Sequence, residues 1–567
     1  MSPAELLKKS LQKATNTFEL EGVLEVELEH PNDLANGDYS SNIAMKLAGK
    51  LKRNPFEVAE QIAQHLKNQT ELESVVESIE VAKPGFINFK LTSEYLAQLI
   101  SKVDSNFGKN ETLKNKKAIV EYTDPNPFKV LHIGHLMSNT IGESLARVIE
   151  WSGAEIKRAC YQGDVGMHVA KTLWGLMDMG LEKIPKGDSL NDQVAYLGKA
   201  YAHGSSVYEE GSEEQKTEIK KINKQVYEKS EEKINEIYAW GRQVSLDYFE
   251  IQYKQLGTDF DFYFYESEVA GTGREIVKKY LEQGVFEESQ GAVIFPGEKH
   301  GLHTRVFLNS EGLPTYEAKE LGLAKIKHET YTYDLSVVVT GNEINEYFKV
   351  LLKVMSIIFP ELSTKTTHVG HGMLRLPSGK MSSRTGTVMA AEDLINQAVE
   401  KAKEKESEGD KNVYAKIAIG AIKFSVLSQS AGSDIIFDFE KSLSFDGDSG
   451  PYLQYTQARC LSVLRKAESE KITLSQGLPQ NWQTTEVERF LYRFPEVVQT
   501  SLKENSTHHI ANYLISLARS FNSFYGNTKI VDAADQSSGY KLSIVKATAQ
   551  VLKKGLWLLG IEAPEKM

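Results

Sequence analysis

The sequence predicts an α/β fold built on a parallel sheet with an insertion, preceded by a small α+β domain and followed by an all-α bundle. A short apolar run at 118–122 is followed by a helix-period stretch to Gly153 and then by a second apolar run. A strand, a crossover helix and a strand form a parallel pair. Helical periodicity then dominates the end of the chain. We therefore predict domains at 1–95, at 113–390 with an insertion at about 185–270, and at 391–567.

Composition limits the class of protein. At about 150 residues per domain, the 567 residues suggest three or four domains. The chain is 41% hydrophobic and 25% charged, as in ordinary soluble proteins. No leader-like start or membrane-length apolar run stands out, so we expect a cytoplasmic protein without a membrane partner. Two cysteines provide neither a disulfide framework nor a zinc site. The net charge of −11 argues against indiscriminate nucleic-acid binding but leaves room for local basic patches.

The first 95 residues predict a small α+β domain. A helix is expected at 3–14, an extended stretch at 22–28, and a polar turn at 35–42. Amphipathic helices continue through Leu66, and an alternating strand with a Pro-Gly turn closes the segment at 79–89.

The segment 117–153 predicts a strand, a tight loop and a helix whose first turn contains His132, Gly134 and His135. A helix N-terminus has unpaired N–H groups and partial positive charge, and the glycine would let a ligand approach the backbone. A phosphate chain there would meet two imidazoles and several amides. The alternatives are two histidines that merely start a helix and, less favoured, a metal site, for which no further Cys or His lies nearby.

The second strand, at 154–160, leads into a loop that carries Asp164 and His168. Ligands of parallel sheets bind beyond the carboxyl ends of the strands, so both residues would face the same crevice as His132. Simple turn chemistry at Gly-Asp is the alternative. The charged run at 213–233 predicts a solvated helix face, and the aromatic cluster at 260–265 favours packing over base stacking.

The second half of the α/β domain is predicted to resume at Gly312. A helix carrying Glu317, Lys319 and Glu320 precedes a buried strand at 335–340, with Glu343 at its carboxyl end. The segment 379–386 places two cations among small residues, which suits a loop that folds over polyphosphate. The bundle helices are expected at 414–428, 452–468, 510–525 and 542–559.

Two motifs together identify a family. HIGH at His132–His135 and KMSSR at Lys380–Arg384 resemble the signatures of class I aminoacyl-tRNA synthetases. The stretches VEYTDPNPFKVLHIGHL, GDVGMH, PTYEAKE, SGPYLQYTQAR and LLGIEAPEKM narrow the resemblance to arginyl-tRNA synthetases over nearly the whole chain, as do GDYSSNIA and KPGFINF near the start.

This resemblance implies a Rossmann-type catalytic domain with an insertion, an α-helical anticodon-binding domain, and an N-terminal domain that binds the elbow of tRNA. The implied activity forms arginyl-adenylate and pyrophosphate from arginine and ATP, and then moves arginine to the 3′-terminal adenosine of tRNA(Arg), at the 2′-hydroxyl. The expected ligands are arginine, ATP with Mg²⁺, and tRNA(Arg), without zinc. A monomer is expected, and activation is expected to require bound tRNA.

An arginine substrate carries a guanidinium whose burial needs carboxylates with a matching fork of acceptors. By resemblance, the arginine-binding residues are Glu121, Asp124, Asn126, Asp164, His168, Tyr316, Glu320 and Glu343. Asn126 and Glu121 would hold the α-amino and carboxylate end, and Tyr316 with Glu320 would bind the guanidinium. The chain departs from the family pattern at Asp124, His168, Glu320 and Glu343, where Ser, Gln, Asp and an amide are more usual.

The resemblance also implies the catalytic and ATP-binding residues. His132, His135, Lys129 and Lys380 would be catalytic, and ATP would bind to His132, Gly134, His135, Lys380, Met381, Ser382, Ser383 and Arg384. Ser383 stands where the family motif has its second lysine. Many arginyl enzymes use a lysine upstream of HIGH instead, and Lys129 matches that place. We therefore expect Lys129 and Lys380 to stabilise pyrophosphate together.

The expected tRNA contacts are Tyr452, Tyr455, Tyr525 and Met567 near the anticodon, and Tyr39 and Asn42 near the elbow. Aromatic rings can stack on unpaired bases, although tyrosines in a bundle often belong to its core. Two other functions remain open at this point. One is an HxGH nucleotidyltransferase that adenylylates a small acid without RNA, and the other is an inactive paralogue that binds tRNA.

Overall fold

A computed structural model describes residues 2–18, 24–377, 389–405 and 411–567. The chain divides into two compact units. The first unit comprises Met1–Phe107, Arg459–Phe494 and Ser516–Val551, and the second comprises Gly108–Ala458, Pro495–Ile515 and Leu552–Met567. The C-terminal helical segment therefore contributes to both units.

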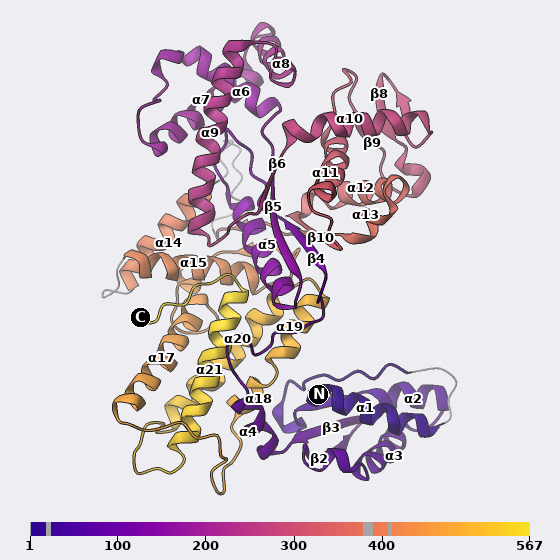
Figure 1. The fold of residues 1–567 in the computed structure, drawn as a ribbon, viewed down its shortest axis with the longest axis vertical. Coiled ribbons are helices and arrows are strands. Elements are labelled where there is room, and N and C mark those ends of the chain that lie inside the picture. Colours follow the sequence, from indigo (N-terminus) through magenta and orange to yellow (C-terminus); the bar gives the residue numbers. More distant parts are fainter. Residues whose placement is uncertain (1, 19–23, 378–388, 406–410) are drawn as a thin grey trace. The chain divides into compact units, whose positions relative to one another are not determined.

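The centre of the second unit is a parallel sheet of five strands in the order β11-β10-β4-β5-β6 (Figure 1). Its strands are β4 (Lys117–Glu121), β5 (Glu155–Gln162), β6 (Phe262–Tyr265), β10 (Leu335–Gly341) and β11 (Thr366–His371). Helix α5 (Ile133–Trp151) is the predicted crossover between β4 and β5. The chain leaves β4 toward β5 and later returns beside β4 as β10, so the sheet has its topological switch point between β4 and β10. The predicted Rossmann-type α/β fold is confirmed.

Four helices follow β5 and form a cluster with its own core. They are α6 (Met167–Met179), α7 (Leu190–Glu210), α8 (Glu213–Glu228) and α9 (Glu232–Gln255). Helix α8 buries only Ile219, Ile222 and Val226, which confirms a largely solvated charged helix. The aromatic cluster is strand β6, which pairs with β5. The insertion therefore ends before Phe262 rather than near 270, because these aromatics complete the main sheet.

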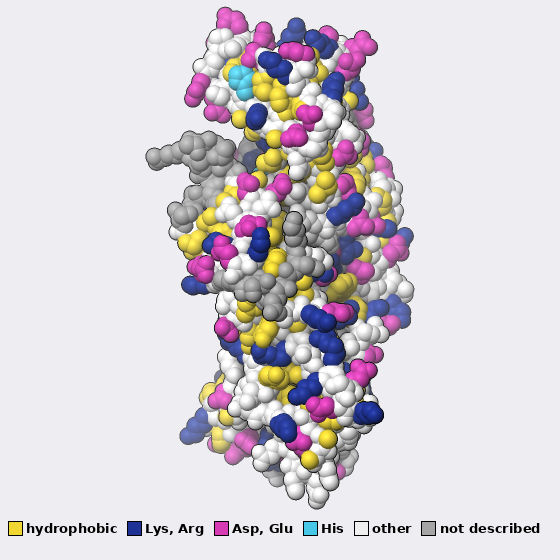
Figure 2. Space-filling model, turned by 90° about the vertical axis from the view of Figure 1, so that its left-hand side faces the viewer, with side chains coloured by type: hydrophobic (Ala, Val, Ile, Leu, Met, Phe, Trp, Pro, Cys, Tyr) yellow, Lys and Arg dark blue, Asp and Glu magenta, His cyan; other side chains and the backbone are white. Residues whose placement is uncertain are grey.

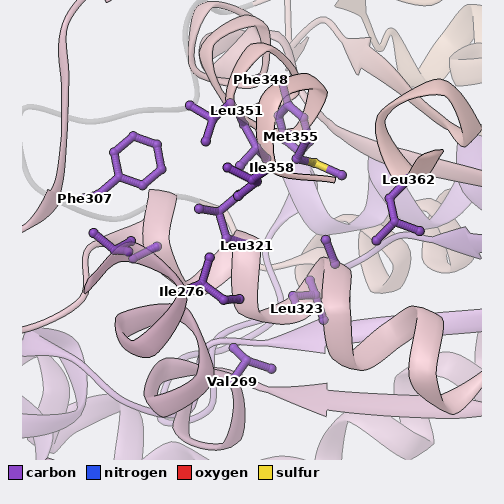
Figure 3. Close-up of a cluster of buried hydrophobic side chains, with 14 of the residues drawn as sticks. Val269, Ile276, Phe307, Leu321, Leu323, Phe348, Leu351, Met355, Ile358 and Leu362 are labelled. Atoms are coloured by element: carbon purple, nitrogen blue, oxygen red, sulfur yellow. The ribbon is translucent and has the colours of Figure 1, made fainter. Parts of the chain in front are cut away.

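A second group of helices, which follows β6 and precedes β11 in the sequence, packs around one hydrophobic core. They are α10 (Glu266–Glu282), α11 (Tyr316–Thr330), α12 (Asn345–Ile358) and α13 (Pro360–Lys365), with a small antiparallel sheet of β7 (Glu287–Ser289), β8 (Ala292–Phe295) and β9 (Arg305–Leu308). Figure 3 shows Ile276, Leu321 and Met355 converging from three of these helices. This core fixes α11, which carries Tyr316 and Glu320.

The N-terminal segment is the predicted α+β domain. Its elements are α1 (Pro3–Thr15), β1 (Tyr39–Ser41), α2 (Ile43–Leu51), α3 (Pro55–Lys67), β2 (Val76–Ala82), β3 (Phe86–Leu91) and α4 (Ser93–Ser101). The strand predicted at 79–89 is instead a hairpin, β2 and β3. The turn predicted at 35–42 contains edge strand β1, which pairs with β3 because Tyr39 packs into the core.

The chain after residue 390 is largely helical, as predicted. Its helices are α14 (Ala391–Lys405), α15 (Lys411–Leu427), α16 (Phe439–Ser442), α17 (Gly450–Ser469), α18 (Glu486–Leu491), α19 (Phe494–Lys503), α20 (His508–Asn527) and α21 (Ser538–Leu558). The two-residue strand β13 (Ile435–Ile436) pairs with β12 (Leu374–Arg375), which precedes this segment.

The end of α21 is bound within the second unit by polar contacts. Arg147 Nη1 donates to the carbonyl of Trp557 at 2.8 Å, and Ser144 Oγ donates to the carbonyl of Leu558 at 2.8 Å. Buried Lys423 donates to the carbonyl of Gly560 at 2.7 Å. The last turn of the final helix is thereby fixed to α5 and α15.

On the face drawn in Figure 2, Lys and Arg side chains are interspersed with Asp and Glu, although the net charge of the chain is −11. None of the described helices is long and apolar enough to cross a membrane.

Candidate active site

The loop between β4 and α5 lies at the carboxyl end of β4, beside the switch point of the sheet. Three non-glycine residues in it have positive φ: Thr123 at 79°, Asp124 at 47° and Phe128 at 69°. Each left-handed residue costs about 1–2 kcal/mol for an L-amino acid. Such strain persists only where neighbouring groups determine the backbone, and it is concentrated at functional sites.

The two histidines of HIGH cap the start of α5. His132 is the N-cap, and its Nδ1 accepts from the Gly134 amide at 3.1 Å, while His135 Nδ1 accepts from the His132 amide at 3.2 Å. Their rings stack with centroids 3.6 Å apart. A Cβ at position 134 would lie 2.9 Å from His132 Cε1, so Gly134 leaves room for the imidazole. Since each Nδ1 accepts, each neutral ring carries its proton on Nε2 and can donate from there.

Both imidazoles are neutral at pH 7. Burial, followed by the charge of Lys129, lowers the pKa of His132 to about 4. Burial and the neighbouring His132 lower the pKa of His135 well below its ordinary value. The pair therefore stabilises negative charge as neutral hydrogen-bond donors and not as imidazolium ions.

The expectation that open amides in the first turn would bind phosphate is wrong for two of them. The Ile133 amide donates to the carbonyl of Met389 at 3.3 Å, and the Gly134 amide is taken by His132. Ala390 also forms an antiparallel bridge with His132. Met389 and Ala390 thus lie directly against HIGH.

Carboxylates converge between β4 and α11, as the arginine hypothesis requires. Glu121 Oε2 lies 2.7 Å from Nζ of Lys327, with 2% and 5% of these side chains exposed. Asp124 and Glu320 lie close enough that Glu121 raises the pKa of both. Lys327 was not predicted at this site, because it lies 206 positions from Glu121 in the chain. If all were ionised, three carboxylates and one ammonium would carry excess negative charge, which a cationic ligand would neutralise.

The protonation of this cluster reflects that excess. Burial and then the charge of Glu121 raise the pKa of Glu320 to about 8. The same two causes raise the pKa of Asp124 well above its ordinary value, although its Oδ1 accepts from the Tyr161 amide at 2.7 Å. A bound guanidinium would stabilise the ionised carboxylates and reverse these shifts.

Three other predicted arginine ligands come from three different segments of the α/β domain. Asn126 lies beside Gly163, where a Cβ would come within 2.4 Å of its Oδ1. Tyr316 begins α11 and is 66% exposed. Glu343, after β10, is exposed and near His132, whose pKa it raises slightly against the effect of burial.

Asp164 and His168 are engaged by the protein itself. Asp164 is 0% exposed, and it accepts from Tyr238, Arg242 and Ser267 at 2.8–3.0 Å. His168 Nε2 donates to the carbonyl of Gly163 at 2.9 Å, and burial and then Lys129 lower its pKa to about 3. Groups of the protein itself thus already bind the carboxylate of Asp164, which corrects the expectation that Asp164 offers it to arginine, and His168 bonds to the backbone of the neighbouring loop.

Lys129 lies near HIGH, since its charge acts on both histidines, and its Nζ is 5.0 Å from the ring centre of Tyr201. His371, at the end of β11, was not predicted. It is 5% exposed, its Nδ1 donates to the carbonyl of Gly372 at 2.8 Å, and it is close enough to affect the pKa of His135. Its position at the carboxyl end of a parallel strand could have indicated a site residue, because ligands bind at that end of the sheet.

Predicted residues Lys380, Met381, Ser382, Ser383 and Arg384 lie outside the described residues. Within the described ranges, no group of three or more His, Cys, Asp or Glu side chains could hold a metal ion.

The predicted tRNA contacts differ in exposure. Tyr39 is 1% exposed in the N-terminal core, which corrects the expectation that it contacts tRNA. Asn42 is half-buried before α2. Tyr525 is 41% exposed, with Arg459 5.1 Å from its ring centre. Tyr452 and Tyr455 are half-buried on α17, and Met567 packs against the hydrophobic cluster that includes Tyr414 and Leu443.

Comparison with known proteins decides the family. Residues 96–439 match the family described as tRNA synthetases class I (R), catalytic domain. The chain belongs to the arginyl-tRNA synthetases. Residues 4–91 match the arginyl tRNA synthetase N terminal domain, and residues 453–567 match the DALR anticodon binding domain.

Similar arginyl-tRNA synthetases span the same length. The arginine–tRNA ligase of Clostridioides difficile is 31% identical, with 96% of each chain covered. That of Flavobacterium psychrophilum is 30% identical, with 100% of each covered. The structure of Thermus thermophilus arginyl-tRNA synthetase aligns with a TM-score of 0.80 at 24% identity, covering 99% of this chain and 100% of that one. The last comparison supports the fold.

Proposed function

We propose how the described residues carry out the reaction of this family. An arginine–tRNA ligase is ATP-dependent: a carboxylate oxygen of arginine bonds to the α-phosphorus of ATP as the bond to pyrophosphate breaks. A ribose hydroxyl of the tRNA 3′-terminal adenosine then attacks the arginyl carbonyl and releases AMP. The observation that carries the assignment is the buried carboxylate cluster of Glu121, Asp124 and Glu320 beside HIGH.

In this proposal Glu320 and Asp124 bind the guanidinium, with Tyr316 at the mouth of the pocket. Asn126 holds the α-amino and carboxylate end together with Glu121, which Lys327 already neutralises in part. Glu343 adds a further carboxylate near the substrate, while Asp164 and His168 support the loop after β5. Paired carboxylate oxygens suit the planar fork of guanidinium donors.

Activation rests on positioning and charge stabilisation, without a covalent protein nucleophile. His132 and His135 donate from Nε2 to phosphate oxygens, and Lys129 neutralises the leaving pyrophosphate together with Lys380, proposed from the sequence. Mg²⁺ enters with ATP as part of the substrate, with water filling much of its shell.

The remaining proposals concern the whole chain. The N-terminal α+β segment binds the tRNA elbow near Asn42, and the helices carrying Tyr452, Tyr455, Tyr525 and Met567 bind the anticodon. We also propose that the protein is a cytoplasmic monomer and that activation requires tRNA. Pyrophosphate exchange without tRNA would contradict the last point.

Incubating the protein with ATP, total tRNA and each amino acid in turn tests the proposal. Charging with arginine alone supports it. AMP formation without RNA would indicate the small-acid adenylylating enzyme, and tRNA retention without charging would indicate an inactive paralogue.

Arginine binding should strengthen as pH rises. The pKa of Glu320 is about 8 in the free protein, and only the ionised carboxylate pairs with guanidinium. Calorimetry should therefore show Kd falling by up to about tenfold per pH unit between pH 6 and 8. The free protein should lose stability over the same window, since this folded-state pKa lies above its ordinary value, and arginine should restore it. A Kd that is constant from pH 6 to 8 would contradict the role of Glu320.

Lys129→Ala should slow pyrophosphate exchange. Removing one charge-stabilising donor costs roughly 10²–10³ in rate at preorganised sites, and we expect the lower end here because Lys380 would share the role. Lys171→Ala is the matched control, because Lys171 also lies over a tyrosine ring, 4.6 Å from that of Tyr208. An unchanged exchange rate in Lys129→Ala would remove Lys129 from the mechanism.

A further inference from the structure

Thr123 is held in its left-handed conformation by two adjacent side chains of α5. Its amide donates to Ser138 Oγ at 2.9 Å, and its Oγ1 accepts from Asn139 Nδ2 at 3.0 Å. Ser138 Oγ in turn donates to the carbonyl of Val339 in β10 at 2.8 Å. A β-branched residue at a φ of 79° is disfavoured unless its surroundings fix it, and these contacts do so.

Asn139 joins two loops through a single amide. Its Oδ1 accepts from Thr258 Oγ1 at 3.1 Å, so the amide spans the loop after β4 and the loop after α9. Asn139, Thr123 and Thr258 are 0%, 2% and 4% exposed. Water cannot readily replace these bonds, and loss of the amide would free both loops.

The conformation of Thr123 determines where the next residue points. Asp124 follows with a φ of 47°, and its Oδ1 accepts from the Tyr161 amide at the end of β5. Its carboxylate is thereby kept near Glu121 and Glu320. A relaxed backbone at Thr123 would rotate Asp124 away from that cluster.

We propose that Asn139 is a positioning residue for the arginine pocket, which fixes Thr123 so that Asp124 converges with Glu320. This inference rests on the proposed function, which assigns both carboxylates to the guanidinium. Asn139 itself touches no substrate. It acts through the backbone of the loop after β4.

Asn139→Leu removes the amide at similar volume and is the first test. In aminoacylation with saturating ATP and tRNA, the KM for arginine should rise about tenfold, the effect of losing a buried hydrogen bond. The kcat should stay within about threefold, and the KM for ATP should be unchanged. Thr140→Val is the matched control, because Thr140 is 1% exposed on the same helix and bonds only to Leu136 in that helix.

A double-mutant cycle separates positioning from general destabilisation. Thr123→Val breaks the same bond from the other side, so it should also raise the KM for arginine, and the pair Thr123→Val with Asn139→Leu should be no worse than Asn139→Leu alone. Glycine adopts positive φ without strain, so Thr123→Gly combined with Asn139→Leu should recover much of the lost affinity. If Asn139→Leu does not fold, the KM for arginine is compared between Thr123→Val, Thr140→Val and the two combined. Only the variants that carry Thr123→Val should show an increase.

Asp124→Asn separates the positioning role of Asn139 from the assignment of Asp124 to the guanidinium. If Asp124→Asn raises the KM for arginine while Asn139→Leu and Thr123→Val do not, the positioning role is wrong and the pocket assignment stands. If Asp124→Asn has no effect, the pocket assignment itself fails. Equal increases in the KM values for arginine and ATP, or additive effects in the cycle, would also overturn the positioning role.

Discussion

His135→Ala is expected to lower the rate of arginine activation by roughly 10²–10³, as when a preorganised donor is removed. The reason is the Nε2–H group, which a neutral and buried imidazole can offer to a phosphate oxygen without reorganisation. Pyrophosphate exchange at saturating arginine, ATP and tRNA measures the effect. The wild-type rate should show no ionisation of His135 between pH 6 and 8, because its pKa lies well below that range.

His135→Gln separates the catalytic role from the capping role. Gln at the third helical position can accept from the N-cap amide, as in a capping box, and so replaces the contact that Nδ1 makes. We expect it to recover the Tm of the wild type while the rate stays at least tenfold lower. A loss below about tenfold in His135→Ala would reduce HIGH to a structural helix start.

Glu320→Gln is expected to raise the KM for arginine by about 10² or more, since truncating one partner of a buried charge pair costs roughly 2–5 kcal/mol. The substrate guanidinium would otherwise be buried with fewer carboxylates. Steady-state aminoacylation measures the change, and the KM for ATP should stay the same. Selectivity for arginine over citrulline, its uncharged analogue, should fall, because the neutral amide that replaces the carboxylate does not attract the positive charge of the guanidinium.

Glu317→Gln is the matched control for this substitution. Glu317 lies one turn earlier on α11, is 8% exposed, and has Arg305 3.8 Å away. Its loss should change the KM for arginine by less than about threefold, because Glu317 is not assigned to the guanidinium and its charge is the smallest of the effects that raise the pKa of Glu320. Equal effects of the two substitutions would indicate that α11 is merely destabilised.

Local patterns predicted the helices and strands whose apolar residues recur at a clear helical or strand spacing. The strand, loop and helix around His132 and the later helices of the chain were found within a few residues, because apolar spacing determines which face is buried. Strand β6 was missed as part of the sheet. Its aromatics fit many kinds of packing, and only pairing with β5, about 100 positions earlier, makes it a strand.

The residue types of the site could be predicted from the sequence, but their ion-pair partners and protonation states could not. Sequence reasoning found Glu121, Asp124 and Glu320, but not the ammonium of Lys327, which lies 206 positions from Glu121 in the chain. Similarly, no pattern shows that His132 and His135 use Nδ1 as helix caps, which fixes their tautomers and leaves Nε2 to donate. Such properties arise from tertiary contacts.

The bonds that hold the end of α21 have a consequence for synthesis on the ribosome. Residues Leu552–Met567 belong to the same unit as HIGH, and the carbonyls of Trp557, Leu558 and Gly560 complete contacts with α5 and α15. Domains usually fold as they emerge, N-terminal parts first. Here the unit that carries the active site lacks these contacts until residues 557–560 have left the exit tunnel, so a chain interrupted before Trp557 would lack a finished catalytic unit.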